Sequence, residues 1–382
     1  MIKLVHIITT LNTGGAEMML YKLLARMKRE RFHNTVIVLA QNGSVGEKIQ
    51  ALGIPVHALN MRRGAPNPMA VLKLARWLRK LNPQVIQTWM YHADLLGGLT
   101  NQLATRAPLA WGIRHSNLDP QHNKRGTLLV AKACARLSRK LPARIVCNSE
   151  AACANHIAFG YDASKMLVIP NGFDLSTFQP NPEARLSVRR ELGLPEQSML
   201  IGLVGRFDPQ KDHRNFIEAA GLLHKNFADA HFVLCGEGIT QENEPLMSWM
   251  KAAALEENCH LLGRRDDVPR LLAAFDIATS SSLGEAFPNV IGEAMACGVP
   301  CVVTNAGDSA MIVGSTGRIV PVQNVAALAE AWRELLSLNE EERARLGQAA
   351  RARVQEHFDL EVIARRYEEL YENATQPPLI KN

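Results

Sequence analysis

Two carboxylates, Glu285 and Glu293, stand eight positions apart in the segment Gly284–Pro300. The segment predicts a loop that holds Glu285, followed by a short helix that holds Glu293. Backbone N–H groups at a helix start attract phosphate, and carboxylates accept hydrogen bonds from sugar hydroxyls. The pair therefore favours a nucleotide sugar over a metal ion. An ordinary αβ unit whose helix ends at Gly298 is the structural alternative.

Two cations, Arg206 and Lys211, follow an apolar run that predicts a strand at Met199–Val204. Arg and Lys at the carboxyl end of a strand suit a diphosphate. A solvated turn would have a similar composition. Together with the two carboxylates, however, the cations complete a site for both halves of a nucleotide sugar.

These motifs resemble family 4 of the retaining glycosyltransferases, whose signature is a Glu-x7-Glu element that follows a Gly-Arg-x-x-x-x-Lys loop. The resemblance covers nearly the whole chain, and further matching pieces occur in the family's order: Asn12–Glu17, Ile169–Asp174, Cys235–Gly238 and Leu262–Pro269. It implies the GT-B fold, an α/β architecture in which two Rossmann-like domains face each other across a cleft. It also implies sugar transfer with retention at the anomeric carbon.

The resemblance implies roles for the site residues. Arg206 and Lys211 would hold the donor's pyrophosphate and neutralise charge as the sugar departs. Glu285 would bind the hydroxyls of the sugar, and Glu293 those of the ribose. The other expected donor-binding residues are two N-terminal glycines, two turns near the nucleobase and the backbone around the short helix: Gly14, Gly15, Gly236, Glu237, Gly263, Arg264, Ala286, Phe287, Pro288, Asn289 and Val290.

Two histidines in the first half of the chain are acceptor-side candidates. His92 follows a predicted strand, and the resemblance makes it a candidate for contacting the transferred sugar; a structural hydrogen bond beside Tyr91 is the alternative. His115 follows another strand in the same way. Retaining chemistry often uses a carboxylate nucleophile, but the sequence nominates none. The expected catalytic residues are therefore Arg206, Lys211, Glu285 and His92.

No cofactor and no metal ion are expected, and the nucleotide sugar serves as a co-substrate. The first loop carries Gly14 and Gly15 in place of Gly-x-Gly-x-x-Gly, which disfavours a dinucleotide-dependent oxidoreductase. The two glycines permit close approach of a ligand, or they form a plain tight turn. The chain lacks an Asp-x-Asp motif. The pair Asp266–Asp267 is interpreted as a helix cap rather than as a metal site.

The length of 382 residues suffices for two domains. Short apolar runs alternate with helical patterns in two series, which predicts two parallel α/β domains. We expect an acceptor-binding domain at 1–175, a donor-binding domain at 176–360 and a C-terminal segment at 361–382, whose helix by resemblance crosses back to the first domain. The proline-rich stretch 170–195 predicts the linker. The seven cysteines are interpreted as small buried hydrophobic residues.

Charge is divided unevenly along the chain. Residues 1–190 carry 26 Lys and Arg against 9 Asp and Glu, whereas residues 191–382 carry 17 against 28. Such asymmetry predicts an anionic partner. No nucleic-acid-binding motif is visible, so an anionic membrane or a pyrophosphate-bearing lipid is favoured. Basic helical patterns at 69–81 and 127–141 are the candidate contact, and solvated helix faces are the alternative.

The sequence therefore predicts a cytoplasmic, metal-independent glycosyltransferase, for which contact with the inner face of the cytoplasmic membrane is a hypothesis. It would transfer a hexose or N-acetylhexosamine from a nucleotide sugar, with UDP favoured, to a glycan or lipid-linked acceptor in surface polysaccharide or glycolipid synthesis. Two alternatives stay open. One is an epimerase or hydrolase of UDP-N-acetylhexosamine with the same fold, which would release UDP without an acceptor. The other is a non-catalytic scaffold in a glycan-assembly complex.

Overall fold

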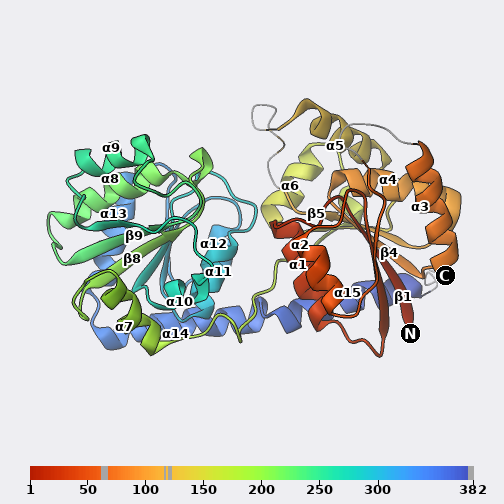
Figure 1. The fold of residues 1–382 in the computed structure, drawn as a ribbon. Helices are drawn as coiled ribbons and strands as arrows, with labels where there is room; N and C mark the ends of the chain where they lie inside the picture. The colour runs from red at the N-terminus through yellow and green to blue at the C-terminus, as the bar shows by residue number, and fades with distance from the viewer. Residues whose placement is uncertain (62–67, 116–117, 119–122, 377–382) are drawn as a thin grey trace. The chain divides into compact units, whose positions relative to one another are not determined.

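The computed structural model describes residues 1–61, 68–115, 118 and 123–376, and these form two compact units. Unit 1 contains Met1–Gly172 and the C-terminal segment that begins at Leu360, and unit 2 contains Phe173–Asp359. Each unit is built on a parallel sheet with helices on both faces (Figure 1). The chain passes from one unit to the other at Gly172–Phe173 and returns at Asp359–Leu360, close to the boundaries expected after residues 175 and 360.

The sheet of unit 1 has seven parallel strands in the order β3-β2-β1-β4-β5-β6-β7. Most of their residues are buried, as expected for strands that are covered on both faces. Their bounds are β1 Ile2–Ile8, β2 Phe32–Val38, β3 Val56–Ala58, β4 Val85–Trp89, β5 Leu109–Ile113, β6 Arg144–Cys147 and β7 Met166–Val168.

Two groups of helices cover the sheet of unit 1 and pack into separate apolar cores. On one face lie α1 (Gly15–Arg26), α2 (Ser44–Ala51) and α15 (Leu360–Thr375). On the other lie α3 (Pro68–Leu81), α4 (Tyr91–Ala104), α5 (Arg125–Leu137) and α6 (Glu150–Ala158), with the short 3-10 helix η1 (Ala163–Lys165) before β7. The final helix α15 packs against α1, so the C-terminal segment belongs to the unit that contains the N-terminus.

The sheet of unit 2 has six parallel strands in the order β10-β9-β8-β11-β12-β13. Their bounds are β8 Met199–Val204, β9 Ala230–Cys235, β10 Cys259–Leu261, β11 Ile277–Ser280, β12 Cys301–Thr304 and β13 Arg318–Val320. The helices are α7 Pro182–Glu191, η2 Pro209–Lys211, α8 His213–His224, α9 Glu244–Ala252, α10 Val268–Ala273, α11 Asn289–Ala296, α12 Ser309–Val313, α13 Val325–Ser337 and α14 Glu340–His357.

Both predicted series of strands are confirmed, but the predicted linker is wrong in part. The stretch 170–195 contains the helix α7, which belongs to unit 2. Asn181 caps this helix, since its side chain accepts a hydrogen bond from the Ala184 N–H at 3.1 Å. Pro182 occupies the first turn, where a proline removes no intrahelical hydrogen bond. The prolines therefore mark a helix start instead of an extended connection.

All seven cysteines are free and buried, so their interpretation as small hydrophobic residues is confirmed. Within the described ranges, no helix combines the length and the hydropathy that crossing a bilayer requires.

Candidate functional site

In each sheet, successive strands of the chain are added first towards one edge and then towards the other. The strand order reverses between β1 and β4 in unit 1 and between β8 and β11 in unit 2. In open parallel sheets, ligands bind outside the carboxyl ends of the strands at such a reversal. In unit 2 these ends are Val204 and Ser280. The loops that follow them carry Arg206, Lys211 and Glu285. Topology therefore brings the cations and the first carboxylate of the sequence motifs to one edge of one sheet.

Lys211 and Glu285 are in direct contact across this edge. Lys211 Nζ lies 2.5 Å from Glu285 Oε1, and Ser282 Oγ donates to the same oxygen at 2.8 Å. The two charged side chains are only 27% and 13% exposed, so water screens the pair less than it would a surface pair. Two residues that the sequence predicted separately thus form one polar centre.

Backbone contacts fix the position of this ion pair. Ser281 Oγ donates to the carbonyl oxygens of Lys211 and Asp212 at 2.8 and 3.0 Å, and the Leu283 N–H donates to the Gln210 carbonyl at 2.7 Å. The sequence analysis missed the serines. The run Ser280–Ser282 directly before Gly284 was a readable signal, since hydroxyls at a strand end often bond to a neighbouring loop.

Arg206 lies at the surface of the same loop, with 67% of its side chain exposed. Its Nε and Nη2 atoms donate to Asp208 Oδ2 at 3.0 and 2.8 Å. Burial acts to raise the pKa of Asp208, but hydrogen bonds from the Gln210 N–H and from Arg206 outweigh it, and the pKa is lowered. Asp208, which the sequence analysis did not single out, therefore stays ionised and holds the guanidinium in place.

Main-chain hydrogen bonds join the Arg206 loop to the loop after β9, and join that loop to the turn at Gly263. The donors and acceptors are Gly205 N–H to Cys235 O, Phe207 N–H to Glu237 O, and Gly236 N–H to Gly263 O, at 2.8, 2.7 and 2.8 Å. Gly236 has φ +154, and a Cβ there would lie 2.1 Å from the Gly205 oxygen. Only glycine allows this approach. The predicted nucleobase turns at Gly236, Glu237 and Gly263 thus lie next to the predicted phosphate loop.

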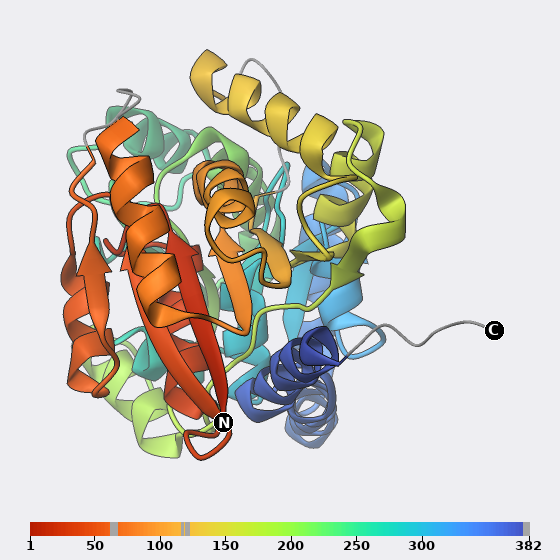
Figure 2. The same cartoon turned by 90° about the vertical axis from the view of Figure 1, so that its right-hand side faces the viewer.

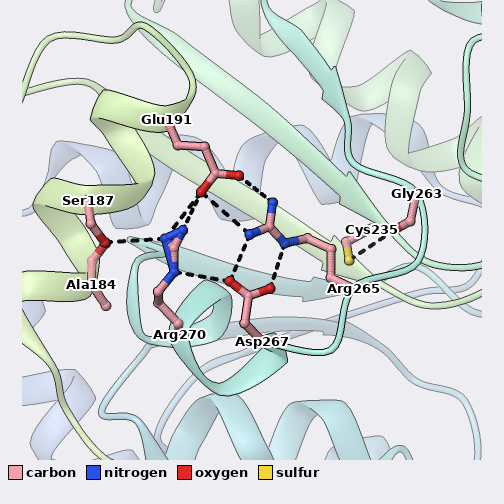
Figure 3. A network of polar contacts seen from close by, with 8 residues as sticks. All are labelled: Ala184, Ser187, Glu191, Cys235, Gly263, Arg265, Asp267 and Arg270. Carbon is pink, nitrogen blue, oxygen red and sulfur yellow. Dashed lines mark hydrogen bonds and ion pairs between the residues drawn. The ribbon is translucent and has the colours of Figure 1, made fainter.

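A network of arginines and carboxylates supports the turn at Gly263–Arg264 (Figure 3). Arg265 contacts Asp267 and Glu191, with Nε–Oδ1 and Nη1–Oε1 distances of 2.7 and 2.5 Å, and Arg270 contacts the same two carboxylates. These hydrogen bonds, led by the one from Arg265, lower the pKa of Glu191 against the opposite effect of burial. The network ties the turn to α7. Arg264 itself is exposed.

The interpretation of Asp266–Asp267 as a helix cap is confirmed for the position of Asp267 but not for a capping hydrogen bond. Asp267 occupies the N-cap position of α10, but its side chain caps no backbone N–H. Its carboxylate instead binds Arg265 and Arg270, because two charged donors form stronger hydrogen bonds than a peptide N–H does. Asp266 is exposed. Among the described residues, no three His, Cys, Asp or Glu side chains are grouped so that they could hold a metal ion.

The helix α11 begins at Asn289 and carries Glu293, whereas Glu285 lies in the loop before it, as predicted. Pro288 is the N-cap residue and offers no side-chain acceptor to the first turn. The Phe287 ring is buried and stacks on Phe173 at 6.0 Å between ring centroids. Between Ala286 and Val290, the side chains of Phe287 and Pro288 thus serve the core, and their main chain is what can meet a ligand.

His213 is a further residue that the sequence analysis missed. It is the first residue of α8, two positions after Lys211, and it is buried against the Phe207 ring at 5.4 Å between ring centroids. Burial is the main cause that lowers the pKa of His213 to about 4, and the Lys211 cation contributes. A neutral imidazole therefore underlies the cationic loop. A single histidine in the sequence gives no sign of its burial, so this residue could not be found beforehand.

At the sheet reversal of unit 1, the two N-terminal glycines lie at the start of α1 and His92 lies at the start of α4. Gly14 is the N-cap of α1 in an extended conformation, and a Cβ on Gly15 would meet nothing within 4 Å. This geometry fits a plain turn as well as close approach of a ligand. His92 is the second residue of α4. Its side chain reaches solvent, but the part of it that the protein covers loses hydration, which lowers its pKa. The hydroxyl of Tyr91 bonds to His156 Nε2 at 2.8 Å.

The turn that carries His92 is held in a strained conformation. Met90, between β4 and α4, has φ +74 and ψ +154, a region that costs about 1–3 kcal/mol for a residue other than glycine. Its N–H donates to the Gly112 carbonyl at 2.8 Å. The buried Asp94 on α4 accepts from Thr88 Oγ1 at 2.5 Å and from the Gly112 N–H at 3.3 Å. Burial raises the pKa of Asp94 to about 8.

His115, the other acceptor-side candidate, is half-buried after β5 and bonds through Nε2 to Asn123 Oδ1 at 3.2 Å. Arg114 beside it binds Asn171 Oδ1 at 2.8 Å and lies over the Trp89 ring, 4.8 Å from its centroid. Ser116 and Asn117, which follow in the same motif, lie outside the described residues. The hydrogen bond to Asn123 gives His115 a structural contact, whereas His92 extends from the surface.

Two family models match the chain. The model described as Glycosyltransferase Family 4 matches residues 13–177, and the one described as Glycosyl transferases group 1 matches residues 185–353. The first range lies mainly in unit 1 and the second entirely in unit 2. The motifs that carried the resemblance therefore belong to two matched regions.

Curated relatives are bacterial enzymes. The UDP-Gal:alpha-D-GlcNAc-diphosphoundecaprenol alpha-1,3-galactosyltransferase of Escherichia coli is 30% identical over 241 residues, 62% of this chain and 61% of that protein. The N,N'-diacetylbacillosaminyl-diphospho-undecaprenol alpha-1,3-N-acetylgalactosaminyltransferase of Campylobacter jejuni is 26% identical over 351 residues, 88% of this chain and 90% of that protein. The match thus spans about three fifths of the first relative and most of the second.

Solved structures share the fold over nearly the whole chain. HepE of Anabaena, solved in complex with UDP and glucose, has a TM-score of 0.82 and 24% identity, and covers 98% of this chain and 100% of its own. Sucrose-phosphate synthase of Thermosynechococcus elongatus has a TM-score of 0.77 and 20% identity, with 97% and 98% covered. At these identities the likeness establishes the fold, which is GT-B with two Rossmann-like domains.

Proposed function

Because the chain belongs to family 4 of the glycosyltransferases, we propose that it transfers a hexose or N-acetylhexosamine from a nucleotide sugar to a glycan or lipid-linked acceptor. The anomeric configuration is retained, and neither a metal ion nor another cofactor takes part. UDP is the proposed nucleotide, and surface polysaccharide or glycolipid synthesis is the proposed setting. The E. coli and C. jejuni relatives, whose names specify diphosphoundecaprenol-linked acceptors, support the lipid-linked acceptor.

The contact between Lys211 and Glu285 at the sheet reversal carries this proposal. It puts a cation and a carboxylate next to each other where an open parallel sheet binds ligands. Arg206, with its exposed guanidinium, lies in the same loop as Lys211. A nucleotide sugar has a diphosphate for the two cations and hydroxyl groups for the carboxylate.

The proposed mechanism starts from the pairing without ligand, in which Lys211 binds Glu285 and Arg206 binds Asp208. A diphosphate competes for both cations. As the bond to the sugar breaks, negative charge grows on the leaving phosphate, so the cations stabilise the transition state more than the bound donor. The leaving phosphate takes the acceptor's proton on the same face of the sugar. The Ser282 hydroxyl keeps Glu285 in place to accept hydrogen bonds from the sugar.

The remaining residues have proposed binding roles. Glu293 on α11 binds the ribose, and the main chain at the start of this helix meets the phosphates and the sugar. The turns at Gly236–Glu237 and Gly263–Arg264 hold the nucleobase. Gly14, Gly15 and His92 of unit 1 contact the substrates, with His115 as a second residue on the acceptor side. A lipid-linked acceptor would place the protein at the inner face of the cytoplasmic membrane, and we propose a peripheral association there.

A panel of nucleotide sugars, each scored by thermal stabilisation, tests the donor. A ligand at about 100 times its dissociation constant adds roughly 2.7 kcal/mol to stability, so the true donor should raise the melting temperature of the intact chain and not that of Lys211→Ala. UDP release is then measured with and without an acceptor extract. Acceptor-dependent release supports the transferase, acceptor-independent release supports the epimerase or hydrolase, and no stabilisation by any donor supports the scaffold.

A further inference from the structure

Three adjacent helices of unit 1, α3, α4 and α5, cover one face of its sheet side by side (Figure 1 and Figure 2). Each buries an apolar stripe in the core, and each also leaves large apolar side chains exposed. We call the outer surface of these three helices the α3–α5 face. Its exposed apolar residues are Met69 and Leu72 on α3, Leu99 and Leu103 on α4, and Leu129 on α5. Three of them, Met69, Leu103 and Leu129, are 67–68% exposed.

The charge of the α3–α5 face has a single sign. Neither α3 nor α5 contains an acidic residue, and the one acid of α4, Asp94, is fully buried. Helix α4 itself carries no Lys or Arg. Exposed cations lie on α3, on α5 and in the turns after α4 and α5: Lys73, Arg76, Arg79, Lys80, Arg106, Lys132, Arg136, Arg139 and Lys140. On an ordinary solvated helix face both signs are usually interspersed. The composition of this face is instead that of helices that lie on an anionic bilayer.

The end of α5 also borders a hollow of about 380 Å³. Lys132, Arg136 and Arg139 line one side, and Phe159 and Gly160, which follow α6, line another. None of the ion pairs between described residues includes these three cations. The Asp162 carboxylate lies near enough to Arg139 that this cation, after the hydrogen bond from Ser164, contributes to lowering the pKa of Asp162. Lys165 bonds to the carbonyl oxygens of Ser138, Arg139 and Pro142 at the end of this segment. The hollow thus offers concentrated positive charge beside an apolar ring.

We infer that the α3–α5 face docks on an anionic phospholipid bilayer, with its exposed apolar side chains in the interface and the hollow at α5 occupied by a phosphorylated lipid headgroup. Lys and Arg neutralise the headgroups, and Leu and Met enter the boundary of the acyl chains. Single-stranded nucleic acid, the other common polyanion, is bound through exposed aromatic rings between cations. The apolar side chains exposed on this face are aliphatic.

This inference deepens the proposed peripheral association and rests on it for its biological setting, but its test needs neither donor nor acceptor. The full chain is sedimented with vesicles of phosphatidylcholine alone and with vesicles that also contain phosphatidylglycerol. We expect binding only to the anionic vesicles. The triple variant Lys132→Glu, Arg136→Glu, Arg139→Glu should lose this binding by about tenfold or more, because each cation near an anionic surface contributes.

A matched control reverses three exposed cations elsewhere in unit 1, Lys28→Glu, Arg29→Glu and Lys48→Glu, with the same change in net charge. It should keep most of the binding. A second variant, Leu103→Ser with Leu129→Ser, leaves the charge unchanged and should weaken the part of the binding that survives high salt. All three variants should keep the donor-induced thermal shift of the intact protein, which separates this inference from the proposed function.

Three outcomes would overturn the inference. The intact chain could fail to prefer anionic vesicles, the control triple could lose as much binding as the triple at the hollow, or DNA or inorganic phosphate could bind the face tightly while vesicles do not. If no donor raises the melting temperature of the intact chain, that result would count against the proposed function. It would not affect the conclusion drawn from the vesicles.

Discussion

The sheet reversals of the two units share one topology but carry opposite chemistry. In unit 2 the loops after β8 and β11 present charged side chains in pairs, Lys211 with Glu285 and Arg206 with Asp208. In unit 1 the strands at the reversal and the helix after them bury polar side chains, of which His6 and Asp94 are the clearest. Burial lowers the pKa of His6 to about 4 and raises that of Asp94 to about 8, so both are neutral near pH 7.

This difference distinguishes the proposed binding residues of unit 2 from the buried polar residues that support the fold of unit 1. Charges that stay partly in water can exchange partners when an anionic ligand arrives, whereas buried neutral groups are fixed by their hydrogen bonds. Asp94 is held by Thr88 and Gly112, and His6 by Asn34 and Trp89. Unit 2 should therefore respond to substitution mainly in kinetics, and unit 1 mainly in stability and in its dependence on pH.

The largest effect is expected at the Lys211–Glu285 pair. Lys211→Ala removes a cation from the leaving phosphate and should lower kcat by about 10²–10³-fold, with little change in melting temperature. Glu285→Gln should have a similar effect. Because the two side chains touch, the double variant should lose less than the product of the single losses. Steady-state release of the nucleotide, measured with acceptor present, gives these values.

Arg318→Ala is the matched control for this pair, since it breaks another ion pair of unit 2, that with Glu334 at 2.7 Å, on the edge strand β13. Its kcat should stay within about twofold of the original, because an exposed pair contributes little. If Lys211→Ala also kept its kcat, the charged loops at the unit 2 reversal would not be the catalytic part of the molecule.

The next effect concerns acid and unit 1. His6 is fully buried, and its pKa in the folded state, about 4, lies below the unfolded value of 6.5. The folded protein then binds fewer protons than the unfolded chain between these values. Stability is lost as pH falls from about 6.5 towards 4, by up to about 3 kcal/mol for this residue. His6→Gln should flatten the fall in melting temperature between pH 7 and pH 4.5, although it starts from lower stability.

The exposed His33 on β2 provides the control, and His33→Gln should leave the acid dependence unchanged. His156, whose pKa burial also lowers to about 4, should keep part of the dependence in the His6 variant. If the melting temperature of His6→Gln fell with pH as steeply as that of the original protein, the buried neutral imidazole of His6 would not govern stability in acid.

The same contrast explains how much the sequence could predict. In unit 2 the candidate site could be predicted from residue type and spacing, because Arg206, Lys211 and Glu285 lie in the loops after predictable strands. The roles of Ser282, Asp208 and His213 depend on which side chains meet across loops, and local patterns do not contain that information. In unit 1 the positive φ of Met90 and the burial of Asp94 result from tertiary packing. An ordinary methionine and an aspartate on a helix give no sign of either.

A smaller effect is expected where unit 1 holds Asp94. Thr88→Val keeps the shape of the side chain but removes the hydroxyl that donates to Asp94 Oδ1. A buried acceptor that loses a partner costs about 1–3 kcal/mol, which a urea titration would detect. Thr88→Ser should recover most of this loss. If Thr88→Val were as stable as the original, the hydroxyl would not be what holds the turn before His92.

The smallest effect should come from the network of Figure 3, which lies next to the proposed nucleobase turn. Arg265→Lys keeps the charge but cannot bridge Asp267 and Glu191 as a fork, because lysine ends in a single ammonium. The lysine ammonium can still bind one of the two partly exposed carboxylates. The change should therefore cost no more than the roughly 0.2–1 kcal/mol of an ordinary ion pair, and the melting temperature should hardly move. The turn at Gly263 would lose its fixed position, and KM for the donor should rise by up to about fivefold with kcat unchanged.

Arg333→Lys is the matched control. It alters the pair with Glu330 on α13 and should leave KM unchanged. A fall in kcat without a change in KM would contradict this prediction. It would mean that Arg265 acts on the transition state and does not merely support the loop that binds the donor.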